Sequence, residues 1–406
     1  MFEFNKNRIY IIFFLVYCMI PIFEFYYFNY IPLFYLDILK YSSIELAFVQ
    51  IFPYLPLIIT PFLSLYYDKY VKKEVQAKLI LYTFCFILSG SFLIFILFKH
   101  ILILYAVFLF FYLFSVSIIR TVMINLFLNI IKESNSIKKK LIFLVRIANI
   151  IGILGISIFF QFIVSNISSL EQWNLFFVIG WIFSFSFIFI IILLNSKIQL
   201  LYHDSNENQL INQKKDCINN NKAFSMMFIL YIVFFLGSSD YLFAFLFSSW
   251  IFNKFGEFSW RLYNSLYFIF IISEFLGSWI AYNLSDKLDK RKLIFVGFSS
   301  YIFIMISLTV SNFLLLIILN SFLFLIGSIC TFTYTSFVSD ISKNEKYKTF
   351  KYQLLHTYQS LARIVFIPLG FFLYFFITVE NIITVSTFLF GISAIFIIST
   401  FLFNKE

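Results

Sequence analysis

Six side chains of fixed charge lie inside long apolar stretches of this 406-residue chain. A charge at the centre of a bilayer costs about 2.5 kcal/mol or more, so such groups face protein or a water-filled cavity. Carboxylates and guanidinium groups in these surroundings can bind a solute or carry a proton, and static ion pairs are the structural alternative. The six residues are Glu24, Asp240, Glu274, Arg120, Arg146 and Arg363.

Depth along the apolar stretches separates these candidates. At about 1.5 Å per helical residue, Glu24 lies about 22 Å and Asp240 about 25 Å from the inner ends of their stretches. Glu274 and Arg363 lie at similar depth. Because burial and a nearby arginine favour opposite protonation states of a carboxylate, Glu274 is the main candidate for a proton carrier. A permanent salt bridge between Glu274 and Arg363 is the alternative.

The remaining titratable groups are less distinctive. Arg120 and Arg146 lie nearer the cytoplasmic side, where either could bind an anionic substrate, gate the inner end or extend toward the membrane surface. His356 lies about two turns into its helix and could relay protons, or it could be a packed histidine. The cysteines and the other histidines are scattered, so we expect no metal site, disulfide framework or cofactor. The cysteines are Cys18, Cys85, Cys217 and Cys330.

The elements that position these groups are membrane spans. With 62% hydrophobic and 12% charged residues, the chain exceeds the apolar content of a soluble fold. The apolar runs are too long for membrane β-strands, and helices satisfy their own backbone in lipid. We expect an all-α polytopic membrane protein with twelve transmembrane helices, at 9–33, 46–67, 78–98, 101–131, 141–165, 173–195, 223–252, 260–284, 291–310, 313–339, 350–378 and 381–403.

The basic residues indicate the orientation of the chain. The net charge is +10, but nearly all of the Lys and Arg in loops fall in alternate loops, counted from the N-terminus. The positive-inside rule then places both termini in the cytoplasm and argues against a nucleic-acid partner. Trp173, Trp250 and Trp260 fall at predicted outer interfaces, where aromatic anchors are common.

Two similar segments indicate that the chain is duplicated. Residues 64–73 read SLYYDKYVKK and residues 282–291 read YNLSDKLDKR, each between two apolar runs. The longest polar stretch separates the two copies. These features predict two pseudo-symmetric six-helix bundles at 1–195 and 223–406, joined by a cytoplasmic linker at 196–222.

The repeated segment resembles the loop signature of the major facilitator superfamily, G-x-x-x-D-[RK]-x-G-[RK]-[RK]. Ser64 and Val71 replace the two glycines in the first copy, and Tyr282 and Asp289 replace them in the second. The resemblance implies a cavity lined by helices 1, 4, 7 and 10, which Glu24 and Asp240 could face. It also implies conformational gating by the acidic and basic residues of both copies, which are Asp68, Lys69, Lys72, Lys73, Asp286, Lys287, Lys290 and Arg291.

Two further segments resemble the branch of proton symporters for sugars, nucleosides and aromatic acids. They are residues 144–152, LVRIANIIG, and residues 273–275, SEF. The resemblance implies a monomeric secondary transporter in the plasma membrane that binds a small-molecule substrate and uses protons as coupling ion. The chain has no P-loop, so a gradient would supply the energy. The alternatives are a facilitator or channel, a non-transporting membrane sensor and, less favoured, an integral-membrane enzyme.

Overall fold

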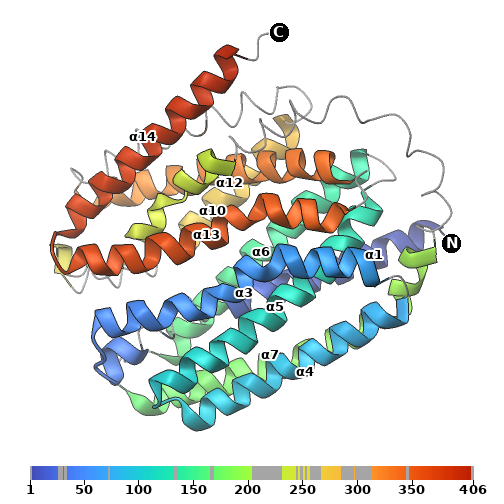
Figure 1. Cartoon of the computed structure of the whole chain (residues 1–406), viewed down its shortest axis with the longest axis horizontal. Coiled ribbons are helices and arrows are strands. Elements are labelled where there is room, and N and C mark those ends of the chain that lie inside the picture. Colours follow the sequence, from blue (N-terminus) through green and yellow to red (C-terminus); the bar gives the residue numbers. More distant parts are fainter. Residues whose placement is uncertain are drawn as a thin grey trace. The chain divides into compact units, whose positions relative to one another are not determined.

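The computed structural model describes most of the chain as helix (Figure 1). The described residues are 2–25, 31, 34–71, 74–131, 135–164, 169–203, 231–243, 246, 250–251, 254–256, 267–284, 297, 312–343 and 347–403. They fall into two units. Unit 1 comprises Met1–Ile211 and Ser339–Leu354, and unit 2 comprises Asn212–Val338 and Leu355–Glu406.

The described part of unit 1 contains six long α-helices, together with the end of α12 (Phe313–Ser342) and the start of α13 (Lys348–Tyr374). Helix α1 packs against α6 and α7, α3 packs against α5, and α4 packs against α5 and α7. A short π-helix, η2 (Phe34–Ile38), precedes α3. The helices are α1 (Phe2–Phe25), α3 (Ser43–Tyr70), α4 (Glu74–Phe98), α5 (Leu102–Ile130), α6 (Asn135–Ile163) and α7 (Leu170–His203). Helix α7 therefore continues past residue 196, where we predicted the linker to begin.

The described part of unit 2 contains a broken helix and four long ones. Residues 231–236 are helical, a turn follows, and the 3₁₀ helix η3 spans Ser239–Leu242. Helix α14 packs against η3. The long helices are α10 (Tyr267–Leu284), α12 (Phe313–Ser342), α13 (Lys348–Tyr374), whose first turns belong to unit 1, and α14 (Val379–Phe403). The predicted span at 291–310 lies outside the described residues, apart from residue 297.

The start of α3 shows how local sequence sets a helix boundary. Ser42 is the N-cap: its hydroxyl accepts a hydrogen bond from the Glu45 amide, and Glu45 Oε2 accepts one from the Ser42 amide at 2.8 Å. This reciprocal capping box satisfies amide groups that the first helical turn leaves unpaired. The hydrogen bond from the Ser42 backbone also lowers the pKa of Glu45.

Aromatic side chains fill much of the interior of unit 1. Trp173 is fully buried, with ring contacts to Phe34, Phe160, Phe176 and Phe177. The prediction that Trp173 and Trp250 are lipid-facing anchors is therefore wrong, because protein encloses both indoles, and Trp260 lies outside the described residues. Burial of such large side chains is a major source of packing energy.

Helices α1 and α6 approach closely at one glycine. A Cβ atom on Gly152 would collide with the backbone carbonyl oxygen of Cys18. Only glycine allows this approach, which brings α1 against α6 inside unit 1. Gly152 thus has a packing role in the segment 144–152 that resembles proton symporters.

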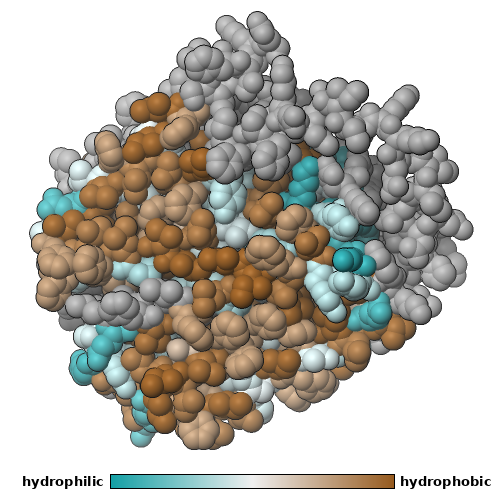
Figure 2. Space-filling model, in the orientation of Figure 1, coloured by the Kyte–Doolittle hydropathy of each residue, from teal (hydrophilic) through white to brown (hydrophobic). Residues whose placement is uncertain are grey.

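Apolar side chains also cover much of the visible surface (Figure 2). Phe86 and Leu97 on α4 and Phe185 and Phe189 on α7 are exposed, as lipid-facing side chains are. By length and composition, five helices within the described residues are able to cross a membrane: Val75–Phe98, Leu102–Ile130, Ile137–Phe160, Leu170–Ile192 and Phe313–Ser342.

Candidate substrate pathway and gating contacts

An ion pair joins two of the predicted site residues in unit 1. Arg120 Nη2 on α5 lies 2.7 Å from Glu24 Oε1 near the end of α1. The side chain of Arg120 is 31% exposed and that of Glu24 is 14% exposed, so the ion pair is partly buried. The hydroxyl group of buried Tyr17, nearly two turns before Glu24, lies within electrostatic reach of Arg120. A carboxylate held by a guanidinium group is suited to exchange its partner for a proton or a solute.

In unit 2, an acidic and a basic side chain, Asp240 and Arg363, lie near the break that follows the helical residues 231–236. Asp240 and Tyr241 lie on η3, and Arg363 lies on α13. Arg363 Nε donates a hydrogen bond of 3.1 Å to the Tyr241 hydroxyl, and its guanidinium carbon lies 5.3 Å from the centre of that ring. Asp240 is within electrostatic reach of Arg363. Tyr241 thus fixes the arginine beside a partly buried carboxylate.

The other predicted pathway residues occupy separate places. Arg146 is partly buried on α6, and Glu274 is partly buried on α10. His356 on α13 contacts the rings of Tyr334 and Tyr358, with ring centres 5.4 and 6.5 Å away. This aromatic setting accounts for the position of His356 by packing, and its proposed role as a proton relay stays a prediction.

Asp68 lies at the end of α3, and its carboxylate contacts the start of α13. Asp68 Oδ2 accepts hydrogen bonds from the Thr349 amide at 2.9 Å and the Phe350 amide at 3.0 Å. These amides belong to the first helical turn, where a negative charge is favoured by unpaired N–H groups and the helix dipole. Burial raises the pKa of Asp68, while the hydrogen bonds from Phe350 and Thr349 and the charge of Lys348 oppose that rise.

Two asparagines of α5 extend this contact. Asn125 Nδ2 donates to Asp68 Oδ1 at 3.3 Å and lies 2.9 Å from Thr349 Oγ1. Asn129 donates to Asn125 Oδ1 and accepts a hydrogen bond from Lys348 Nζ. The ends of α3 and α5 are therefore linked to the start of α13 by polar groups that include backbone amides.

A second contact joins the start of α6 to the end of α12. Lys138 Nζ lies 2.6 Å from Asp340 Oδ1, and Lys343 Nζ lies 3.4 Å from the same oxygen. Lys138 is only 4% exposed, so its charge depends on Asp340 for compensation. All of these residues belong to unit 1.

The basic residues predicted to accompany Asp68 are only partly described. Lys69 is exposed, and its Nζ atom lies 5.1 Å from the centre of the Tyr70 ring. Lys72 and Lys73 lie outside the described residues. So does the whole charged part of the second copy: Asp286, Lys287, Lys290 and Arg291. Within the described ranges, no group of three or more His, Cys, Asp or Glu side chains is placed to hold a metal ion.

Solved structures of membrane transporters share this fold. A D-xylose–proton symporter matches with a TM-score of 0.72 and 13% identity, covering 98% of this chain and 97% of that one. The nucleoside transporter NupG matches at 0.65 and 14% identity, with 99% of each chain covered. The human organic anion transporter MFSD10 matches at 0.70 and 10% identity, covering 97% of this chain and 99% of that one. The chain has the major facilitator fold.

This likeness lies in the fold rather than in the sequence, since no family model and no curated protein matches the chain. The major facilitator fold confirms the prediction of an all-α polytopic membrane protein with twelve transmembrane helices in two six-helix bundles. Two of the solved proteins that share this fold are named as transporters, a D-xylose–proton symporter and a nucleoside transporter.

Several residues that make the contacts around Asp68 and Asp340 were not singled out from the sequence. Asn125, Asn129, Lys138, Asp340 and Thr349 are ordinary polar residues near span ends. Only the spacing of Asn125 and Asn129, four residues apart inside an apolar run, gives a signal that the sequence could have provided. Their partners come from segments about two hundred residues away and depend on the tertiary fold.

Proposed function

We propose that this protein is a secondary active transporter of the major facilitator superfamily that moves a small solute by alternating access in symport with protons. The observation that supports it best is the ion pair between Glu24 and Arg120. These residues lie on the helices that correspond to transmembrane helices 1 and 4, which line the cavity in the family that the sequence resembles. The fold supports the carrier class.

The pair offers a simple route to coupling. With Glu24 ionised, its carboxylate occupies Arg120. Protonation of Glu24 removes that charge and releases the guanidinium group for a hydroxyl or an anionic group of the solute. Proton and solute then bind cooperatively, because each lowers the cost of binding the other. The coupling ion binds at a carboxylate, so no cofactor is needed.

Asp240, Tyr241 and Arg363 form a second polar group in this proposal, on the helix that corresponds to transmembrane helix 7. A planar guanidinium and a phenol hydroxyl provide directional hydrogen bonds for a polar solute. Glu274 is the other carboxylate that could carry the proton. Comparison of Glu24→Gln with Glu274→Gln identifies which acid does so.

The contacts of Asp68 would act as a latch on the cytoplasmic side. Residues 339–354 group with unit 1, whereas the remainder of α13 groups with unit 2. A carboxylate that caps the first turn of α13 therefore stabilises one conformation and must let go for the cycle to proceed. Both termini and the linker lie in the cytoplasm in this proposal, and the protein acts as a monomer in the plasma membrane.

The solute can be sought by thermal stabilisation of the purified protein. The solved relatives are named as transporters of D-xylose, nucleosides and organic anions, so the panel contains D-xylose, uridine and benzoate. Specific binding raises the unfolding temperature whichever way transport runs. The proposal expects stabilisation that is lost in Arg120→Gln. Stabilisation that persists unchanged in that variant would remove Arg120 from the binding site.

A further inference from the structure

The broken first helix of unit 2 is tied to α14 at two separate points. The first is at the break itself. Ser239 Oγ lies 3.0 Å from the Ser386 carbonyl oxygen, to which it donates, and 3.1 Å from Ser386 Oγ. Both serines are fully buried. Ser239 directly precedes Asp240, so this contact holds η3 against the first half of α14.

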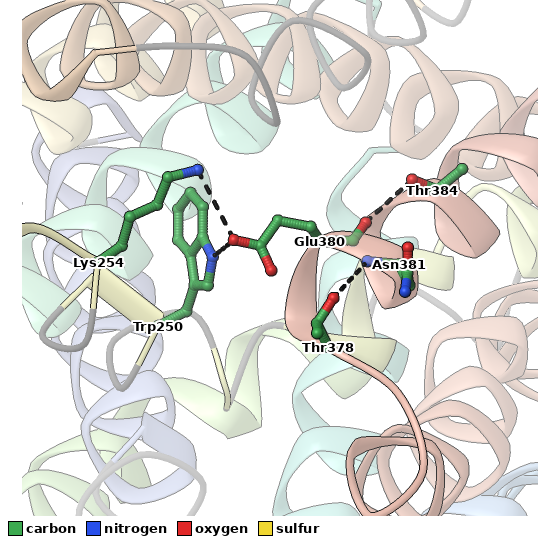
Figure 3. A network of polar contacts seen from close by, with 6 residues as sticks. All are labelled: Trp250, Lys254, Thr378, Glu380, Asn381 and Thr384. Atoms are coloured by element: carbon green, nitrogen blue, oxygen red, sulfur yellow. Dashed lines mark hydrogen bonds and ion pairs between the residues drawn. The ribbon is translucent and has the colours of Figure 1, made fainter.

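The second point lies at Trp250, beyond the break (Figure 3). Trp250 Nε1 donates a hydrogen bond of 2.7 Å to Glu380 Oε1 in the first turn of α14. Lys254 Nζ lies 3.7 Å from the same oxygen and 4.6 Å from the centre of a Trp250 ring. Figure 3 shows Glu380 directed toward both side chains. The indole N–H of Trp250 and the ammonium group of Lys254 therefore approach the same carboxylate oxygen of Glu380, and the ammonium group also lies near the indole ring.

The two contacts flank the candidate site residues along the chain. Asp240 and Tyr241 lie between Ser239 and Trp250, whereas Glu380 and Ser386 are about 9 Å apart along α14. Helix α13 meets the same break, because a Cβ on Gly370 would collide with the Leu242 carbonyl oxygen. The hydrogen-bond geometry of a 3₁₀ turn is poorer than that of an α-helix, so contacts from neighbouring helices add to its stability.

We infer that α14 is the positioning element of this site: Glu380 and Ser386 fix the broken helix through Trp250 and Ser239, and thereby place Asp240 and Tyr241 beside Arg363. This inference rests on the proposed function of that group. Glu380 and Ser386 act on this group through Trp250 and Ser239, so they are positioning residues. The alternative is that the contact between Trp250 and Glu380 is a local surface contact. Its loss would then change the surroundings of Trp250 but not the structure of η3.

Hydrogen exchange of the purified protein, measured by mass spectrometry without any solute, tests the inference. Glu380→Met keeps the length of the side chain but removes the acceptor for Trp250. We expect amides of residues 237–243 to exchange about tenfold faster, because each lost hydrogen bond lowers local protection. Ser239→Ala removes the other contact and should act on the same amides. Unchanged exchange there in both variants overturns the inference.

Two matched variants separate positioning from general damage. Glu380→Gln keeps an oxygen for the Trp250 N–H, so it should retain most of the protection at 237–243. Thr384→Val removes the hydrogen bond that Thr384 donates to the Glu380 carbonyl of its own helix, so it should leave η3 unchanged. An equal effect of Thr384→Val, or of Glu380→Met on α3–α5 of unit 1, would contradict the inference. Because no transport is measured, failure of the proposed function would appear separately, in the solute screen.

Discussion

Asp68 caps a helix that starts 280 residues later in the chain: its Oδ2 atom lies 2.9 Å from the Thr349 amide nitrogen at the start of α13 (Lys348–Tyr374). The contact joins a charged side chain to a backbone group, so it does not depend on which side chain occupies position 349. Asp68 belongs to residues 64–73, the segment that resembles a transporter loop signature. The carboxylate joins the end of α3 to the first turn of α13, and both of these segments belong to unit 1.

Asp68→Asn should weaken this cap while leaving membrane insertion intact. The variant loses the negative charge at a helix N-terminus, and its amide presents a donor where an acceptor is needed. Together these changes remove about 1–2 kcal/mol from the latched conformation. Transport should fall, and accessibility of the cytoplasmic side to a thiol reagent should rise. Uptake at the wild-type rate would defeat the assignment.

Thr349→Val provides the matched control for the latch. It removes the hydroxyl that contacts Asn125 but keeps the backbone amide that Asp68 binds. We expect a smaller loss of transport than in Asp68→Asn. An equal or larger loss would mean that the hydroxyl contact, rather than the helix cap, holds the latch.

Glu24→Gln should uncouple transport from the proton gradient. The neutral amide cannot hold Arg120 as an ion pair, and it cannot take up a proton. Downhill exchange of solute should continue, whereas accumulation should fall about tenfold or more, the factor that about 1.4 kcal/mol supplies. Uptake measured against external pH checks this. A variant that retains the wild-type pH profile would exclude Glu24 as the coupling acid.

Glu274→Gln tests the other carboxylate in the same assay. If Glu24 carries the proton, accumulation by Glu274→Gln should keep its pH dependence, and any loss should appear in the rate alone. Loss of proton-driven accumulation in Glu274→Gln, with Glu24→Gln retaining it, would reverse the assignment and return the role to the residue that the sequence favours.

The contact of Glu380 should depend on pH. Partial burial opposes its ionisation, but the hydrogen bond from Trp250, the backbone amide and the charge of Lys254 together hold the pKa of Glu380 below its ordinary value of 4.5. A lowered pKa stabilises the folded protein above the ordinary value, and this contribution is lost as pH falls through the lowered pKa. Unfolding temperatures of wild type and Glu380→Gln should therefore differ at neutral pH and converge well below 4.5. A constant difference would contradict this.

The sequence predicted the class of the fold because apolar length and basic loops report directly on the membrane. It also placed Glu24, Arg120 and Asp68 among the residues of interest. The partners of these residues could not be predicted from the sequence. Glu24 meets Arg120, and Asp68 meets Thr349, only after helices that are distant in the chain pack together. The same limit explains why Trp173, predicted at the interface, is enclosed by Phe side chains.

The break at Ser239–Leu242 illustrates another limit. The apolar run at 223–252 reads as one continuous helix, and neither Ser239 nor Asp240 marks a 3₁₀ turn by itself. At the break, Leu242 and Ser239 contact Gly370 of α13 and Ser386 of α14, which lie more than a hundred residues away. Local propensity therefore located the span but not its interruption.

The most direct test of the account is solute accumulation in proteoliposomes under an inward proton gradient, with the compound that stabilises the purified protein as the probe. We predict accumulation above the external concentration that collapses with a protonophore and is lost in Glu24→Gln. Equilibration without accumulation under the same gradient would contradict proton-coupled symport and indicate a facilitator or a channel.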